Sequence, residues 1–192
     1  MKRLATQTTL IAAALAICAS AAGALTFEDA LIEGWVGAGA SRALCVIDFG
    51  PASFAFGYRF DGAKTGWDML STIAAQTDLD IVDEASSLGH FINAISYQGW
   101  SGISDPENWS NSNWWEYWTS PDGEAWTSSW LGCGDRALAN GSWDGWTWSP
   151  PWPQVGSAPD VPLPQQVPEP GSLAGLCMLL GLAAPRKLLR RK

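Results

Sequence analysis

Tryptophan is concentrated in one part of the chain, and this constrains the fold more than any other feature. The sequence has 13 tryptophans in 192 residues, and eleven of them fall between Trp100 and Trp152. Tryptophan is a large, mostly apolar side chain that is enriched in strands, and its N–H usually finds a partner when it is buried. This density predicts strands whose aromatic side chains lie on more than one face.

The residue pattern leaves two interpretations of these side chains open. Successive side chains of a strand point to opposite faces of its sheet. In the segment WWEYWTS, Trp114 and Trp118 therefore share one face, while Trp115 and Tyr117 share the other. The indoles either fill the core or form, in part, an exposed platform for a ligand such as a sugar ring. The candidate platform residues are Trp114, Trp115, Trp118, Trp126 and Trp130.

The central sequence predicts one small Trp-rich domain over residues 25–148, of the α+β class and mostly β, with one main helix and an antiparallel sheet. A hairpin turned at Pro121-Asp122-Gly123 is expected over 113–131. Thr65, followed three residues later by Asp68, predicts the capped start of a helix in TGWDMLSTIAAQ. Alternating apolar residues predict further strands at 45–49, 53–60, 79–85, 91–99 and 141–148.

The amino-terminal segment has the pattern of a secretory signal peptide. Lys2 and Arg3 precede an apolar run at 10–18, and Ala22-Gly23-Ala24 offers a small-residue cleavage site. Residues 1–24 are therefore expected to direct export and to be removed.

The segment that follows the domain is rich in proline. Residues 149–170 contain eight prolines, a composition that disfavours helix and sheet interiors and favours extended polyproline II. We expect residues 149–167 to form a linker that holds the domain away from a membrane or wall.

The carboxyl terminus combines three elements in a fixed order. The triplet Pro168-Glu169-Pro170 is followed by an apolar segment at 171–184. As a helix this segment covers about 21 Å, less than the roughly 30 Å hydrocarbon core of a bilayer. We therefore expect a short transmembrane segment that can stop export but is a poor permanent anchor. The basic residues that end the chain are Arg186, Lys187, Arg190, Arg191 and Lys192.

This tail, residues 168–192, resembles the PEP-CTERM sorting signal of exported proteins in Gram-negative bacteria that make extracellular polysaccharide. The resemblance implies that the secretion machinery and an exosortase are partners. It also implies a transient stay of the precursor in the inner membrane, and then a place at the cell surface or in the extracellular matrix. The expected function is a structural or adhesive role associated with exopolysaccharide. The alternative is a small-ligand or carbohydrate binding module that uses tryptophan faces.

The charge of the exported part excludes several partners. Residues 25–167 hold four cations and 18 of the 19 acidic residues, so their net charge is −14. Nucleic acids and anionic lipids are bound by cationic surfaces, which makes both poor candidates.

Two cysteines remain between the removed ends. An even pair in an exported protein predicts one disulfide, between Cys45 and Cys133, with two free buried thiols as the alternative.

The sequence offers little support for catalysis, and we expect neither an enzyme nor a cofactor. His90 is the only histidine, and no cluster has metal-ligand spacing, so no metal site is expected. Paired carboxylates could serve glycoside hydrolysis in principle, but such pairs arise by chance in a chain this acidic. The pairs are Asp78 with Asp80, Asp83 with Glu84, and Asp105 with Glu107.

A weaker resemblance concerns the domain itself. A capped helix after DGAKTGWDML, then GHFINAIS, WWEYWTS and WDGWTW, follow in this order. The arrangement is similar to the small β-rich domain at the carboxyl end of transcobalamin-type carriers, which implies a binding or adhesive module.

Overall fold

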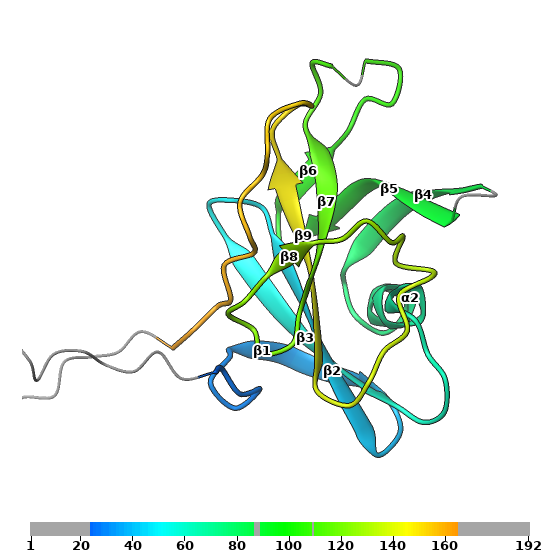
Figure 1. Cartoon of the computed structure of the whole chain (residues 1–192), viewed down its shortest axis with the longest axis vertical. Helices are drawn as coiled ribbons and strands as arrows, with labels where there is room; N and C mark the ends of the chain where they lie inside the picture. The colour runs from blue at the N-terminus through cyan, green and yellow to red at the C-terminus, as the bar shows by residue number, and fades with distance from the viewer. Residues whose placement is uncertain (1–23, 87–88, 109, 165–192) are drawn as a thin grey trace, which may run out of the picture. The chain divides into compact units, whose positions relative to one another are not determined.

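The computed structural model describes residues 24–86, 89–108 and 110–164, and within them the chain is mostly β with one helix, as predicted (Figure 1). The elements in chain order are β1 (Ile32–Gly37), β2 (Ser41–Asp48), β3 (Ser53–Phe60), α2 (Gly66–Gln76), β4 (Asp80–Ser86), β5 (Gly89–Tyr97), β6 (Trp100–Ile103), β7 (Trp114–Ser120), β8 (Thr127–Ser128) and β9 (Ser142–Ser149).

The strands form two sheets. The six-stranded sheet has the order β1-β3-β2-β9-β7-β8, and the three-stranded sheet has the order β4-β5-β6. The smaller sheet is antiparallel. The larger one is mixed, and not antiparallel as predicted, because β1 runs parallel to β3 and β9 runs parallel to β2. Parallel neighbours need a long crossover, and here the whole segment between β2 and β9 provides one.

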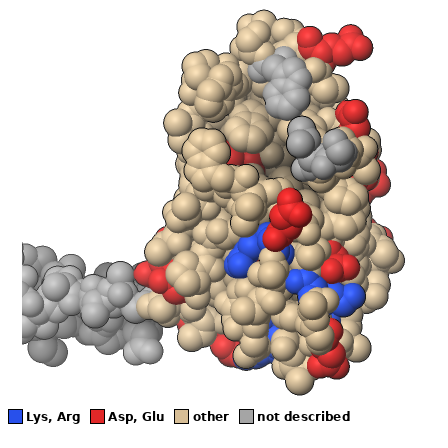
Figure 2. Space-filling view, turned by 45° about the vertical axis from the view of Figure 1, so that its right-hand side comes forward, with Lys and Arg blue, Asp and Glu red and all other residues tan. Residues whose placement is uncertain are grey.

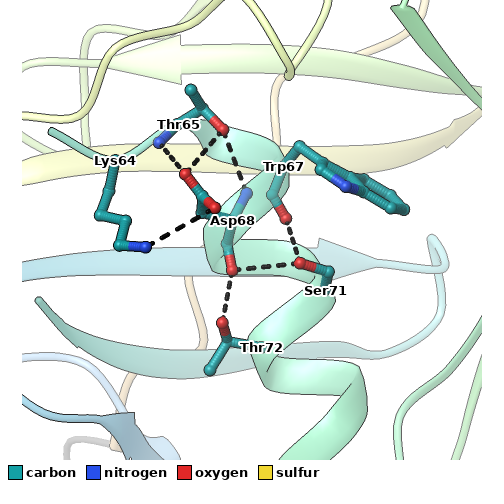
Figure 3. A network of polar contacts seen from close by, with 6 residues as sticks. All are labelled: Lys64, Thr65, Trp67, Asp68, Ser71 and Thr72. Atoms are coloured by element: carbon teal, nitrogen blue, oxygen red, sulfur yellow. Dashed lines mark hydrogen bonds and ion pairs between the residues drawn. The ribbon is translucent and has the colours of Figure 1, made fainter.

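The helix α2 begins at the predicted capping box (Figure 3). The Thr65 hydroxyl accepts a hydrogen bond from the Asp68 backbone N–H at 3.2 Å, and the Asp68 carboxylate accepts one from the Thr65 N–H at 2.9 Å. Lys64 approaches the same carboxylate at 3.8 Å. The cap fixes where the helix starts, and Met69, Leu70 and Ile73 then enter the core.

The six-stranded sheet is buried on both faces. On one face, α2 and the three-stranded sheet enclose the main core, which contains Phe56, Ile73, Ile95 and Trp115. On the other face, a second cluster forms around Phe27, Leu44, Val46, Ala55 and Trp143. Central strand β2 is therefore buried almost throughout, with side chains entering both clusters.

The proline-rich segment supplies part of the second face, so the domain extends beyond the boundary expected at residue 148. The compact unit runs to Pro162. The Gly156 N–H donates to Glu116 at 3.2 Å, and the Asp160 N–H donates to Asp48 at 2.9 Å. Pro159 packs where a side chain at Gly145 would lie. Residues 149–162 thus lie along the sheet instead of forming a free linker.

The predicted signal peptide, except Ala24, and the predicted sorting tail lie outside the described residues. The same holds for the transmembrane segment expected at 171–184. Within the part of the chain that the structure describes, no helix combines the length and hydropathy that a membrane crossing requires.

Candidate functional site

The structure separates the five candidate platform tryptophans into different environments. Trp115 and Trp118 are buried, with 2% and 8% of their surface exposed, whereas Trp130 is 99% exposed. Trp114 and Trp126 are half-buried, and Trp126 packs against the second core cluster. The five side chains therefore do not form one flat platform.

The buried indoles are held by hydrogen bonds as well as by packing. Trp115 Nε1 donates to the Gly102 carbonyl at 3.0 Å and so links β7 to β6. Trp118 Nε1 donates to the Thr147 hydroxyl at 3.0 Å on the opposite face of the sheet. These two residues have core roles, which leaves Trp130 and Trp114 as the platform candidates that adjoin a surface hollow.

That hollow lies between the start of β5, strand β7 and the loop 129–133. Two cavities of about 410 and 160 Å³ both have His90, Phe91 and Gly132 in their walls, and a smaller third one shares Phe91 and Trp114 with its neighbour. Because they share walls, the three adjoin. We call them together the β5–β7 groove, which is defined by Glu84, His90, Phe91, Pro106, Trp114 and Trp130.

One wall of the groove contains an open sheet edge. Strand β7 pairs with β9 along its whole length but with β8 only at Trp118 and Thr119. Within the described residues, no strand pairs with the other edge of β7 at Trp114–Glu116, which is where the groove lies. Backbone polar groups at such an edge are ready to bond with a hydrogen-bonding ligand.

The imidazole of His90 in the groove is held by a side-chain hydrogen bond and by ring stacking. His90 Nδ1 lies 2.6 Å from the Asp83 carboxylate, and the Trp67 ring stacks on the imidazole with centroids 3.7 Å apart. The imidazole is thus fixed between a carboxylate and an indole at the junction of two cavities. Sequence reasoning singled out His90 only as the one histidine and did not predict its place in the groove, which depends on the pairing of β5 with β4.

Behind the groove is a buried polar cluster. The Tyr117 hydroxyl donates to the Asp144 carboxylate, and Arg136 Nε lies 3.6 Å from the same group. Burial raises the pKa of Asp144 to about 6, although the Tyr117 hydrogen bond and Arg136 act in the opposite direction. Burial, followed by the charge of Asp144, also raises the pKa of Tyr117 above its usual range.

Cys45 and Cys133 border this cluster as free, buried thiols, in place of the disulfide expected from the sequence. Cys45 is fixed by strand pairing on both sides of β2, and the Cys133 carbonyl accepts the Trp67 N–H at 2.9 Å. Backbone hydrogen bonds thus hold each residue in place without a cross-link. Burial raises the pKa of Cys133 to about 12 and that of Cys45 well above its usual value, so both thiols stay protonated and are poor nucleophiles.

The predicted sorting residues cannot be placed in this site, because Pro168, Glu169, Pro170 and the basic residues at 186–192 lie outside the described residues. Among the residues that are described, no group of three or more His, Cys, Asp and Glu side chains is arranged to hold a metal ion.

Comparison with known proteins gives no family for the chain. No family model matches it, and no curated protein matches it in sequence. Among solved structures, it is similar to a protein from Ruminococcus gnavus that has been proposed to bind metal, with 12% identity and a TM-score of 0.44. The match covers 59% of this chain and all of the other. At that TM-score the likeness carries no argument about function.

Proposed function

We propose that the chain is an exported surface or extracellular-matrix protein with a structural or adhesive role, and that its domain contacts exopolysaccharide through the β5–β7 groove. The observation that carries this proposal is the placement of Trp130, whose ring is 99% exposed at the rim of an aromatic-lined groove. Large apolar side chains exposed beside a hollow mark interaction sites more often than scattered surface positions do. A flat indole face suits the C–H surface of a sugar ring.

The polar surroundings of the groove support a ligand rich in hydroxyl groups. Ser129 and the open edge of β7 lie beside the aromatic rings, so stacking and hydrogen bonding are offered together. The net charge of −14 over residues 25–167 disfavours nucleic acid and anionic membranes as alternatives.

The proposed location rests on the two ends of the chain. The signal peptide pattern and the resemblance of residues 168–192 to the PEP-CTERM signal support export, exosortase processing and a place at the cell surface. A protein at the surface of a cell that secretes polysaccharide lies next to that polysaccharide, which makes a glycan a suitable ligand. We propose a non-catalytic role for the domain.

The test is a binding titration followed by the protein's own tryptophan fluorescence. The full chain is held in a detergent without a sugar headgroup and titrated with soluble neutral, amino-sugar and uronate polysaccharides. We expect a saturable shift with at least one of them, and about ten-fold weaker binding for Trp130→Ala, equivalent to about 1.4 kcal/mol.

Trp152→Ala is the matched control, because Trp152 is 65% exposed and lines none of the cavities of the groove. If Trp130→Ala and Trp152→Ala lost affinity for the polysaccharide equally, or if the wild-type chain bound none, the proposed function would be contradicted.

A further inference from the structure

Apart from His90, the charged side chains that line the β5–β7 groove are all acidic. Glu84 is exposed and lines the first cavity together with Pro106, and Asp105 lines the adjoining cavity together with the same proline. The Asp83 carboxylate contacts His90, which lines the first cavity. Among the described residues, no Lys or Arg lines any of the three cavities.

The cations of the described chain are engaged elsewhere. Arg42 pairs with Glu28 at 3.1 Å, Lys64 with Asp68 at 3.8 Å and Arg136 with the buried Asp144 at 3.6 Å. Arg59 lies over the Trp35 ring at 5.0 Å. In Figure 2 the Lys and Arg side chains that face the viewer gather in the lower part of the domain, whereas acidic side chains reach its top. A ligand in the groove therefore meets the Glu84 and Asp105 carboxylates with no described Lys or Arg beside them.

This arrangement distinguishes between classes of polysaccharide. A uronate polymer carries a carboxylate on each uronic acid unit. Repulsion between these carboxylates and the acidic side chains of the groove opposes binding. A polymer with free amino groups places ammonium ions beside Glu84 and Asp105, and exposed aromatic rings such as Trp130 also attract cations. A neutral glycan gains only the stacking and hydrogen bonds.

We propose that the β5–β7 groove selects a polysaccharide that carries free amino groups, of the glucosamine type, over neutral and uronate polymers. The selection rests on the proposed function and adds the ligand class to it. Glu84 on β4 is the residue that the geometry assigns to the sugar amine, because its exposed side chain lines the same cavity as His90 and Phe91.

The experiment compares three oligomers of equal length: glucosamine, N-acetylglucosamine and galacturonate. Each is titrated into the full chain in mildly acidic buffer, where the sugar amines are protonated, at low and at high ionic strength. We expect the glucosamine oligomer to bind about ten-fold more tightly than the neutral one and to lose much of that advantage at high salt. Glu84→Gln is expected to reduce the preference by about three-fold or more.

The matched control is Glu124→Gln, which removes the same charge from an exposed position outside all three cavities. Equal effects of the two variants would assign the preference to net charge and overturn the role of the groove. Equal or tighter binding of the neutral or uronate oligomer would overturn the selection and leave the proposed function standing. No binding of any oligomer, together with no response to the longer polysaccharides, would overturn both.

Discussion

Replacing Trp115 by alanine tests the central assignment, that the tryptophans of β7 belong to the core while Trp130 faces a ligand. The Trp115 ring is 2% exposed and lies 5.2 Å from the rings of both Phe49 and Trp148. Its N–H satisfies the carbonyl of Gly102, a buried residue of the facing sheet. The side chain therefore fills the junction between the two sheets.

The expected loss has two parts. Truncating a buried tryptophan to alanine costs about 3–5 kcal/mol, because transfer free energy is lost and a cavity remains. Leaving a buried carbonyl without a partner costs about 1–3 kcal/mol more when no water reaches it. We therefore expect Trp115→Ala to lower the free energy of unfolding by about 4–8 kcal/mol, a large share of the 5–15 kcal/mol that is typical of a domain.

The measurement is urea unfolding of the full chain, followed by circular dichroism and compared with Trp130→Ala. The exposed Trp130 buries almost no surface, so truncating it removes few contacts. The free energy of unfolding of Trp130→Ala should therefore lie within about 0.5 kcal/mol of the wild-type value. A loss below about 1.5 kcal/mol for Trp115→Ala, or similar losses for the two variants, would refute the division into core and ligand-facing residues.

Two further predictions follow from the buried polar cluster. The pKa of Asp144 is raised to about 6 in the folded chain, so as pH rises this carboxyl ionises first in the unfolded chain. The unfolded state is thereby favoured, and the free energy of unfolding should fall between about pH 4 and 6, by at most about 3 kcal/mol. Unfolding midpoints measured against pH should lose this slope in Asp144→Asn, and an unchanged slope would contradict the assignment. Cys45 and Cys133 should react with iodoacetamide only after unfolding, because both are buried with raised pKa values. Peptide mass mapping shows whether Cys45 and Cys133 carry the label. Labelling of these cysteines in the native chain would contradict their burial, and no labelling of them in the unfolded chain would indicate the disulfide predicted from the sequence.

Local patterns were sufficient for some elements. The alternation of residues 53–60 predicted β3 with its observed bounds, and the Thr65–Asp68 pair predicted the start of α2, because both signals depend on contacts within a few residues. Strand β8 was harder to predict. The expected hairpin arm is only Thr127–Ser128, since the chain then turns away to form the wall of the groove.

The candidate site could be predicted only in part. Trp130 and Trp114 were among the candidates, but so were Trp115 and Trp118. These two buried residues lie on the same strand as Trp114 and are of the same residue type. Alternation assigns side chains to faces without saying what covers each face. The cover on one side is α2 with the three-stranded sheet, and on the other it includes residues 149–162, which composition alone described as a linker.

The sequence by itself determined the mostly β class, the capped helix and the acidic charge, because each is a property of composition or of neighbouring residues. The tertiary structure alone decided which indoles are buried, that β9 returns beside β2, and that His90, Trp114, Trp130 and Glu84 surround one groove. These residues are far apart along the chain. Only the packing of two sheets, with its long-range pairing and burial, brings them together.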